Sequence, residues 1–465
     1  MKIGLVNPNR DIKNPAIHLG LGYIASYLME HLQDVSIMIL DTRVAGKKET
    51  KVFFNTHFDL VGITATSQVF LEAVEISNKI KDHFPSTLIC IGGPHPSTVL
   101  EESLEGFPFD FAVYGEGEIT FYELTLSLRG KMQPEDINGL IYRDISGKIR
   151  VNPPRSVISD INILPFPAYW LFKMKNYPQH RLVTSRGCPY DCVFCNSSAI
   201  WTRKWRMRNP ESIIDEIEFL IKFFGKKTFT FNDDSFNINS KRVLTFCNQL
   251  INRKLEIIWS VPIRVDLVTE QTALLMKKAG CYSVSIGIES ANNEVLKRMN
   301  KNNSIHQISE GINLLKKAAI EITGQFMIGN PGDTLDTIKE SVEFAKKSDL
   351  SSVEFYTALP YKGSELWEFV KNNGKILTDL PAYYYHKIEP RIIFETPDFS
   401  FEDRKQAINL AIDAGFYNAL STDKKSILLD SGKKIAGIFQ ILFKGKFGNE
   451  LYLKMRKIYK KWFTI

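Results

Sequence analysis

The chain has 465 residues, 44% of them hydrophobic, which is enough for about two to four domains with sizeable cores. The net charge is +7, and seven Lys or Arg against one Glu between residues 436 and 465 carry +6 of it. Because the remainder is nearly neutral, we expect no broad nucleic-acid-binding surface. The N-terminus has the pattern of a strand rather than a signal peptide, and no apolar run is long enough to cross a bilayer, so we expect a cytoplasmic protein.

From residue 1 to residue 130, short apolar strands alternate with amphipathic helices, which is the pattern of a parallel α/β sheet. The predicted strands are Lys2–Asn7, Val35–Leu40, Leu60–Thr64, Thr87–Ile91 and Phe109–Tyr114. The predicted helices are Gly20–Leu32, Val69–His83 and Ile119–Leu128. Five strands with intervening helices favour a flavodoxin-like (Rossmann-type) domain, whose ligands bind at the carboxyl ends of the strands.

Glycine and small hydroxyl residues are frequent at the predicted strand ends, in the loops 64–67, 92–97 and 115–118. Glycines let the backbone approach a bulky ligand, and the hydroxyls can bond to it, although each loop alone is also ordinary turn chemistry. The order and spacing of these loops resemble the cobalamin-binding domain that precedes many radical S-adenosylmethionine (SAM) domains. The resemblance implies cobalamin contacts at Thr64, Ser67, Gly92, Gly93, Gly115 and Glu116.

One motif of the wider cobalamin-binding group is missing. The pattern D-x-H-x-x-G, whose histidine ligates cobalt from below, does not occur, because His18 lacks the aspartate two residues before it and His95 lies in a Gly-Pro-His-Pro turn. For both histidines we favour a capping or hydrogen-bonding role. The resemblance then implies cobalamin with its nucleotide tail buried in this domain and no protein histidine on cobalt. A Rossmann-like domain without a cofactor is the alternative.

Residues 131–180 are predicted to form a hairpin and a linker. Apolar stretches at 139–144 and 148–151 flank Ser146-Gly147, a pattern that indicates a β-hairpin. The proline-punctuated segment 163–167 then leads to the next domain.

Three cysteines, Cys188, Cys192 and Cys195, form a C-x3-C-x2-C motif, and such closely spaced thiolates suit an iron–sulfur cluster or zinc. Zinc would need a fourth ligand nearby, but His180 and His386 stand alone, and three thiols cannot all pair as disulfides. A [4Fe–4S] cluster normally takes four thiolates, so three leave one iron open to a non-protein ligand. The cysteines expected instead to be buried hydrophobes are Cys90, Cys247 and Cys281.

The segment 185–195, with Phe194 just before its last cysteine, resembles the signature of radical SAM enzymes. The resemblance implies that Cys188, Cys192 and Cys195 hold a [4Fe–4S] cluster and that SAM binds the open iron through its amino and carboxylate groups. Reductive cleavage of SAM then gives a 5′-deoxyadenosyl radical, which abstracts hydrogen from the substrate.

After the cysteines, strands and helices alternate again. The predicted strands are 181–185, 228–232, 256–261, 283–288, 321–328 and 352–358. Six such units are consistent with the partial (β/α)6 barrel of radical SAM enzymes, over residues 181–367, with the active site at the polar strand ends.

The candidate SAM contacts lie at those strand ends. Asp233 or Asp234 can accept a hydrogen bond from the SAM ammonium group, Glu289 and Ser290 can bond the ribose or the methionyl part, and Arg264 can meet a carboxylate. Each of these residues taken alone is equally well explained as a helix cap or a surface charge.

Residues 368–465 are predicted to be mainly helical and basic, with a helix at 401–420. The lysine-rich, aromatic end of the chain is amphipathic. We favour a helix packed on the barrel, and the alternative is peripheral contact with an anionic membrane or a lipid-bearing substrate.

Taken together, the resemblance implies a cobalamin-dependent radical SAM enzyme, most simply a methyltransferase acting on an unactivated carbon of a small-molecule or lipid-like substrate. One SAM would supply the methyl group through cobalamin, a second would be cleaved at the cluster, and flavodoxin or ferredoxin would donate the electron. The alternatives are a cobalamin-dependent cyclisation or rearrangement without methyl transfer, and a cluster- and cobalamin-binding protein without turnover.

Overall fold

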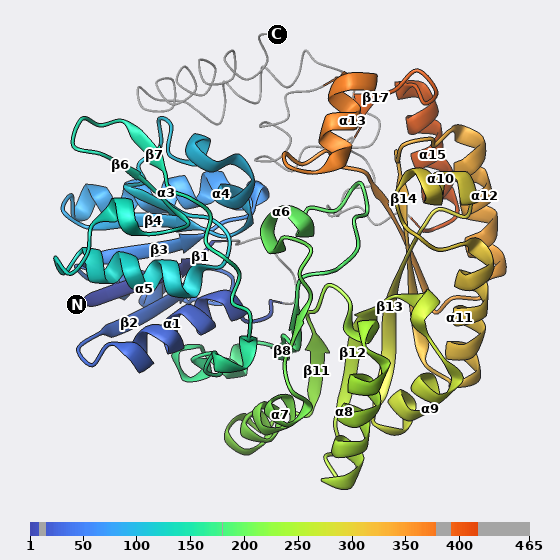
Figure 1. Ribbon diagram of the computed structural model, residues 1–465, viewed down its shortest axis with the longest axis horizontal. Helices are drawn as coiled ribbons and strands as arrows, with labels where there is room; N and C mark the ends of the chain where they lie inside the picture. The colour runs from blue at the N-terminus through green and yellow to red at the C-terminus, as the bar shows by residue number, and fades with distance from the viewer. Residues whose placement is uncertain (9–14, 179, 378–391, 417–465) are drawn as a thin grey trace.

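The computed structural model describes residues 1–8, 15–178, 180–377 and 392–416. Figure 1 shows two α/β bodies side by side, the first in blue and teal and the second in green to orange, with α6 (Ser197–Trp201) between them. Each body is built on one sheet, the first of seven strands and the second of six. The predicted α/β fold class is confirmed.

The first sheet has the order β2-β1-β3-β4-β5-β6-β7. All five predicted strands form and are parallel: β1 (Lys2–Asn7), β2 (Ser36–Asp41), β3 (Leu60–Thr64), β4 (Leu88–Gly92) and β5 (Phe111–Val113). The hairpin expected in the linker, β6 (Leu140–Arg143) and β7 (Ile149–Val151), pairs antiparallel with β5 and so extends this sheet. The physical reason is burial, because Leu140 and Ile141 are fully buried in the core.

Helices cover both faces of the first sheet. Because successive side chains of a strand point to opposite faces, each strand contributes to the hydrophobic core on either side of the sheet. In β1, Leu5 packs with α1 (Leu19–His31) and α5 (Gly117–Ser127), whereas Val6 packs with α2 (Lys47–Phe54) and α3 (Phe70–His83). Helix α2 was not predicted. Only Phe53 and Phe54 of its eight residues are buried, which is too few to give a helical period. The short α4 (Pro94–Val99) follows β4 and contacts α6.

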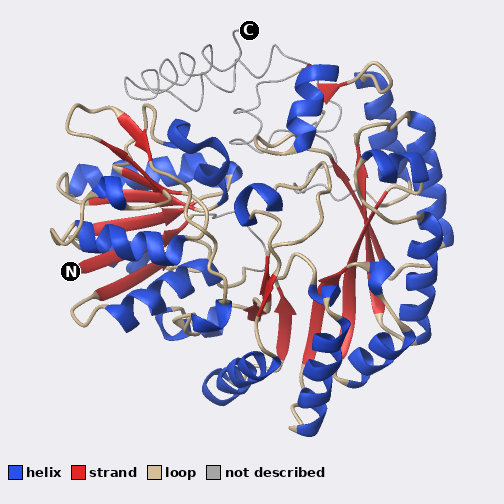
Figure 2. Cartoon of the chain, in the orientation of Figure 1, coloured by secondary structure: helices blue, strands red, loops and turns tan. Residues whose placement is uncertain are grey.

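The second sheet adds its strands in chain order, all of them parallel, as a partial barrel requires. Its strands are β8 (His180–Leu182), β11 (Thr228–Phe231), β12 (Ile258–Ile263), β13 (Cys281–Glu289), β14 (Glu321–Ile328) and β15 (Ser352–Thr357). The helices that follow these strands lie on the outside (Figure 2): α7 (Pro210–Phe224), α8 (Ser240–Asn252), α9 (Glu270–Lys278), α10 (Asn293–Arg298), α11 (Ile305–Lys317) and α12 (Leu335–Lys347).

The cysteines belong to the loop that connects the two strands of a short antiparallel ribbon, β9 (Ser185–Arg186) and β10 (Arg206–Met207). The predicted strand 181–185 is therefore split, with its first half in the barrel and its end in this ribbon. A close contact also fixes the mouth of the barrel, since a Cβ on Gly311 of α11 would lie 2.2 Å from the carbonyl oxygen of Val265. Glycine at 311 thus lets α11 support the turn that begins next to Arg264.

The described C-terminal part contains α13 (Glu365–Asn373), the pair β16 (Lys375–Ile376) and β17 (Phe394–Glu395), and α15 (Phe401–Asp413). The helix predicted at 401–420 is thus present up to Asp413. Its last four residues and the basic end of the chain lie outside the described residues. Within the described ranges, no helix is both long enough and apolar enough to cross a membrane.

Candidate functional site

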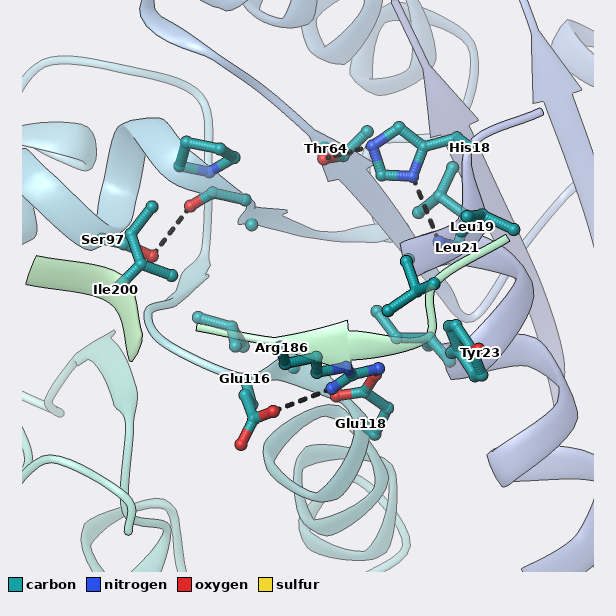
Figure 3. A pocket seen from close by; sticks show the side chains of 18 of the residues that line it. His18, Leu19, Leu21, Tyr23, Thr64, Ser97, Glu116, Glu118, Arg186 and Ile200 are labelled. Carbon is teal, nitrogen blue, oxygen red and sulfur yellow. Dashed lines mark hydrogen bonds and ion pairs between the residues drawn. The ribbon is translucent and has the colours of Figure 1, made fainter. Parts of the chain in front are cut away.

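A cavity of about 480 Å³ lies between the two bodies, a size that suits a small ligand or part of a larger one. One wall comes from the carboxyl ends of β1, β3, β4 and β5 and from the start of α1, and the other from residues 181–187, α6 and the end of β11 (Figure 3). The site therefore joins the glycine-rich loops of the first sheet to the segment that leads into the cysteines.

Most of the residues predicted to contact cobalamin do line this cavity, namely Thr64, Gly92, Gly93, Gly115 and Glu116. Gly92 and Gly115 leave open space, because a Cβ on Gly92 would meet only the carbonyl oxygen of Val113, at 4.0 Å, and one on Gly115 would meet nothing within 4 Å. Gly93 serves the turn instead, with φ +95° and a Cβ position 2.7 Å from Oγ1 of Thr64. The open edge at Gly92 and Gly115 fits a bulky ligand.

The remaining predicted residue, Ser67, is not among those that line the cavity. Its Oγ is 3.0 Å from Nδ1 of buried His95, and burial lowers the pKa of His95 to about 3. His18 does reach the cavity. Its Nδ1 accepts a hydrogen bond from the backbone N–H of Leu21 (3.2 Å), which caps α1, and its Nε2 is 3.4 Å from Oγ1 of Thr64 (Figure 3). Both histidines thus have the hydrogen-bonding environment that we favoured.

A buried ion cluster connects the two walls. Arg186 donates to Glu116 (2.8 Å) and to Glu118 (2.6 Å), and Arg206 donates to both carboxylate oxygens of Glu116 (2.9 Å). The backbone N–H of Ile158 also donates to Glu116, at 2.6 Å, so both oxygens of this carboxylate are bonded to protein groups. Figure 3 shows Glu116 beside Arg186. We predicted Glu116 as a cobalamin contact, and its observed bonds instead join the first sheet to the cysteine segment.

Sequence reasoning missed this cluster because its partners lie far apart in the chain. Arg186 is 70 residues from Glu116, and Arg206 is 90 residues from it. No local period or motif links such positions. The only sequence-level indication was the place of Arg186 immediately before Gly187 and Cys188.

The cysteine loop is held by backbone bonds while its sulfur atoms stay half-buried. The N–H of Val193 donates to the carbonyl of Met299 (3.0 Å), and the Cys195 N–H donates to the carbonyl of Cys192 (2.9 Å). The Ser197 N–H donates to Sγ of Cys195 at 3.4 Å, the kind of bond that tunes a sulfur ligand. Burial raises the pKa of the Cys195 thiol to about 11, and bound iron would favour the thiolate.

Within the described ranges, no three Cys, His, Asp or Glu side chains converge on a single metal ion. A cubane cluster makes a different demand, because each thiolate binds its own iron at a separate corner. Three cysteines on one loop, with an N–H donor directed at sulfur, fit that donor set.

Two cations lie over aromatic side chains of the cysteine loop. The guanidinium of Arg264 is 3.7 Å from the ring centroid of Tyr190, and Nζ of Lys301 is 5.8 Å from that of Phe194. Arg264 also pairs with Asp266 (3.0 Å) and donates to the carbonyl of Lys301 (2.9 Å). The role of Arg264 as a SAM contact stays a prediction, and its observed role is to pack against the loop.

Glu289, at the end of β13, combines an unusual backbone with an ion pair. Its φ is +66°, rare for a residue other than glycine, and the register with β14 shifts at this point. The carboxylate pairs with Lys301 at 3.0 Å. Strained backbone of this kind tends to occur at functional sites. The neighbouring Ser290 is fully buried, and its Oγ accepts from the N–H of Asn292 (3.2 Å) in the turn before α10.

The two adjacent aspartates after β11 have different surroundings. Asp233 accepts from the Thr184 N–H (2.7 Å) and from Oγ of Ser185 (2.6 Å), so it supports the strand before the cysteines. Asp234 lines the cavity and accepts from Oγ of Ser197 (2.9 Å), and burial raises its pKa. Of the pair, Asp234 is the one placed to meet a cationic ligand.

Comparisons with known proteins agree with this two-part site. The radical SAM superfamily model matches residues 182–345, and the B12 binding domain model matches residues 9–125. An uncharacterized methyltransferase of Pyrococcus horikoshii is 34% identical over 391 residues, which cover 81% of this chain and 85% of the relative. An anaerobic magnesium-protoporphyrin IX monomethyl ester cyclase of Rubrivivax gelatinosus is 30% identical, over 65% of this chain and 57% of the relative.

The fold also matches a solved structure, that of the radical SAM methyltransferase TsrM from Kitasatospora setae with tryptophan substrate and a SAM analog bound. The TM-score is 0.73 at 19% identity, covering 92% of this chain and 91% of that one. The chain therefore belongs to the cobalamin-dependent radical SAM enzymes, as its sequence predicted. Its cofactors are a [4Fe–4S] cluster, SAM and cobalamin.

The buried ion cluster makes a direct prediction about stability. Glu116→Gln keeps the shape of the side chain but leaves Arg186 and Arg206 with less than their full counter-charge. We expect the free energy of unfolding to fall by about 3 kcal/mol, measured by urea denaturation. The control is Glu218→Gln, which weakens a pair between Glu218 (43% exposed) and Arg253 (37% exposed) and should cost about 1 kcal/mol or less. Equal losses in the two variants would contradict a clamping role for Glu116.

Proposed function

We propose that the enzyme methylates an unactivated carbon of a small-molecule or lipid-like substrate. The observation that carries this proposal is the shared cavity, in which Gly92 and Gly115 of the first sheet face the same space as Gly187 and Asp234 beside the cysteine loop. A cofactor held by the first sheet and a cofactor held at the cysteines would thus meet within one enclosure, as methyl transfer between them and a substrate requires.

In this proposal, residues 1–130 bind cobalamin and residues 181–367 form the radical SAM core, joined by 131–180 and followed by 368–465. Cys188, Cys192 and Cys195 hold the cluster. When bound, SAM at the cluster supplies hydrogen-atom abstraction and cobalamin supplies methyl transfer. Flavodoxin or ferredoxin is the expected electron donor.

The chain's own side chains bind and orient these groups. Asp234, free of any cation within ion-pair distance in the described residues, accepts a hydrogen bond from the SAM ammonium group. Asp233 keeps the strand before the cysteines in place. Glu289, Ser290 and Arg264 complete the SAM side of the site, while Thr64 and the open edge at Gly92 and Gly115 receive cobalamin, with Gly93 shaping the turn beside them. Exclusion of water follows from the apolar walls formed by Leu5, Leu21, Val113 and Phe121.

A second candidate function is cobalamin-dependent cyclisation or rearrangement without methyl transfer. It is favoured by one finding, the relative from Rubrivivax gelatinosus that is named a cyclase. Both functions would use the same cavity and the same cofactors. They differ in the carbon count of the product.

The cluster assignment predicts which cysteines hold iron. Anaerobically reconstituted protein should contain about four iron atoms per chain, and Ala at position 188, 192 or 195 should remove the cluster absorption. The matched controls are Cys90→Ala, Cys247→Ala and Cys281→Ala. These three thiols are buried in apolar cores, and burial raises the pKa of each. Iron content should stay unchanged in the controls, and iron loss in any of them would contradict the assignment.

The cobalamin assignment predicts a loss of binding in Gly92→Leu. Its Cβ meets no protein atom closer than 4.0 Å, so the larger side chain would extend into the cavity without disturbing the sheet. We expect hydroxocobalamin affinity to fall at least tenfold, measured by absorbance after gel filtration, with iron content unchanged. The control is Gly46→Leu, at an exposed position with φ −77° that any residue can adopt. Retention of cobalamin by Gly92→Leu at the wild-type level would rule out this cavity.

The choice between methylation and rearrangement is decided by labelled product. Reconstituted enzyme, reductant and methyl-labelled SAM are incubated with a metabolite extract from cells that lack the gene. We expect a metabolite that gains one labelled methyl group, together with similar amounts of 5′-deoxyadenosine and S-adenosylhomocysteine. Cys192→Ala is the control and should abolish 5′-deoxyadenosine. Deoxyadenosine without S-adenosylhomocysteine, and a product of unchanged carbon count, would establish the rearrangement instead.

A further inference from the structure

The charged side chains that line the cavity are mostly neutralised by the protein. Arg186 pairs with Glu116 and Glu118, and Arg43 donates to both oxygens of Asp41. His18 is neutral at pH 7, because burial first and Arg43 second lower its pKa to about 4. Two wall residues have no side chain of opposite charge within ion-pair distance in the described part of the chain, namely Asp234 and Arg181.

Asp234 is accounted for by cationic SAM, but no group described so far requires Arg181. It belongs to β8, lines the cavity and lies near Arg43 and His18. Its Nε is buried and has no hydrogen-bond partner within the described residues. Burial, and then the neighbouring charge of Arg43, lower the pKa of Arg181. A guanidinium in such a place is held at a cost in free energy, unless an anion joins it.

The neighbours of Arg181 indicate the charge of the ligand that would pair with it. The charge of Arg43 is already matched by Asp41, Arg43 also donates to the carbonyl of Ala16, and Tyr177 donates a further hydrogen bond to Asp41 (2.9 Å). Among the described residues around Arg181, the carboxylate is that of Asp41, and it is shared between Arg43 and Tyr177. The surplus of one positive charge at Arg181 suits a ligand with a single negative charge and two or more acceptor oxygens.

We propose that Arg181 binds the phosphodiester of the cobalamin nucleotide loop. This inference rests on the proposed function in one respect, that cobalamin occupies this cavity. Cobalamin carries neutral amide side chains around its corrin ring, and the phosphodiester is the one anionic group on its periphery. A guanidinium from the barrel would thereby hold a cofactor whose other contacts come from the first sheet. Arg181 is a binding residue for the cofactor and takes no part in the chemical step.

The test compares two ligands that differ in this group. Hydroxocobalamin contains the phosphodiester and the nucleotide, whereas diaquocobinamide lacks both. Dissociation constants of the full-length protein, with its cluster reconstituted, are measured by absorbance titration for the wild type and Arg181→Met. We expect Arg181→Met to weaken hydroxocobalamin binding about tenfold or more and to leave cobinamide binding unchanged. Unchanged cobinamide binding also shows that the variant is folded.

Two further variants complete the comparison. Arg181→Lys keeps a positive charge and should lose less hydroxocobalamin affinity than Arg181→Met, and it replaces the Met variant if that protein does not fold. Arg253→Met removes a surface arginine paired with Asp215 and should leave both affinities unchanged.

The outcomes separate this inference from the proposed function. Equal weakening of both ligands by Arg181→Met would make Arg181 a structural residue, and no change for either would show that the anion lies elsewhere, for example on the substrate. Both results overturn the proposal. If Gly92→Leu binds neither ligand while Arg181→Met binds both as the wild type does, the cavity remains the cobalamin site and only the role of Arg181 is wrong. If Gly92→Leu retains both, the cavity itself is wrong.

Discussion

Arg186 lies buried between two glutamates at the end of the first sheet and immediately precedes the glycine and cysteine that open the cysteine loop. A buried guanidinium is tolerable here only because Glu116 and Glu118 both accept hydrogen bonds from it. Glu116 also accepts hydrogen bonds from Arg206 and from the Ile158 N–H. One carboxylate thus holds the strand before the cysteines, the strand after them and the linker. The remaining features of the site follow from this arrangement.

The first consequence is the position of the loop. Arg186 lies at its start and Arg206 in the strand that returns from it, so both ends are tied to the first sheet. On the barrel side, Val193 bonds to Met299, and Arg264 packs over Tyr190. The loop is therefore held from both bodies, while its three cysteines are only partly buried. A cluster site that must exchange electrons and bind a small molecule needs both the rigidity and the opening.

Local patterns in the sequence predicted most of the fold, because strand periodicity and the cysteine spacing depend on neighbouring residues. The five parallel strands of the first sheet and the six strands of the barrel were found in this way. The hairpin at 140–151 was misplaced because its pairing with β5 is a long-range choice, decided by the burial of Leu140 and Ile141. For the same reason the sequence could name Glu116 as a residue of the site, but it could not show that the Glu116 carboxylate is paired with Arg186 and Arg206.

The electrostatic pattern of the cavity follows from the same neutralisation. Since Glu116, Glu118 and Asp41 are each matched within the protein, the charges left facing the cavity among the described residues are Asp234, near the cysteine loop, and Arg181, near Arg43. An acid and a base that remain unpaired within one small enclosure would attract each other if they were adjacent. No ion pair joins them within the described residues, and the same wall also contains apolar residues such as Val183 and Ile200. The cavity therefore presents opposite charges at two places, which suits two different ligands bound at the same time.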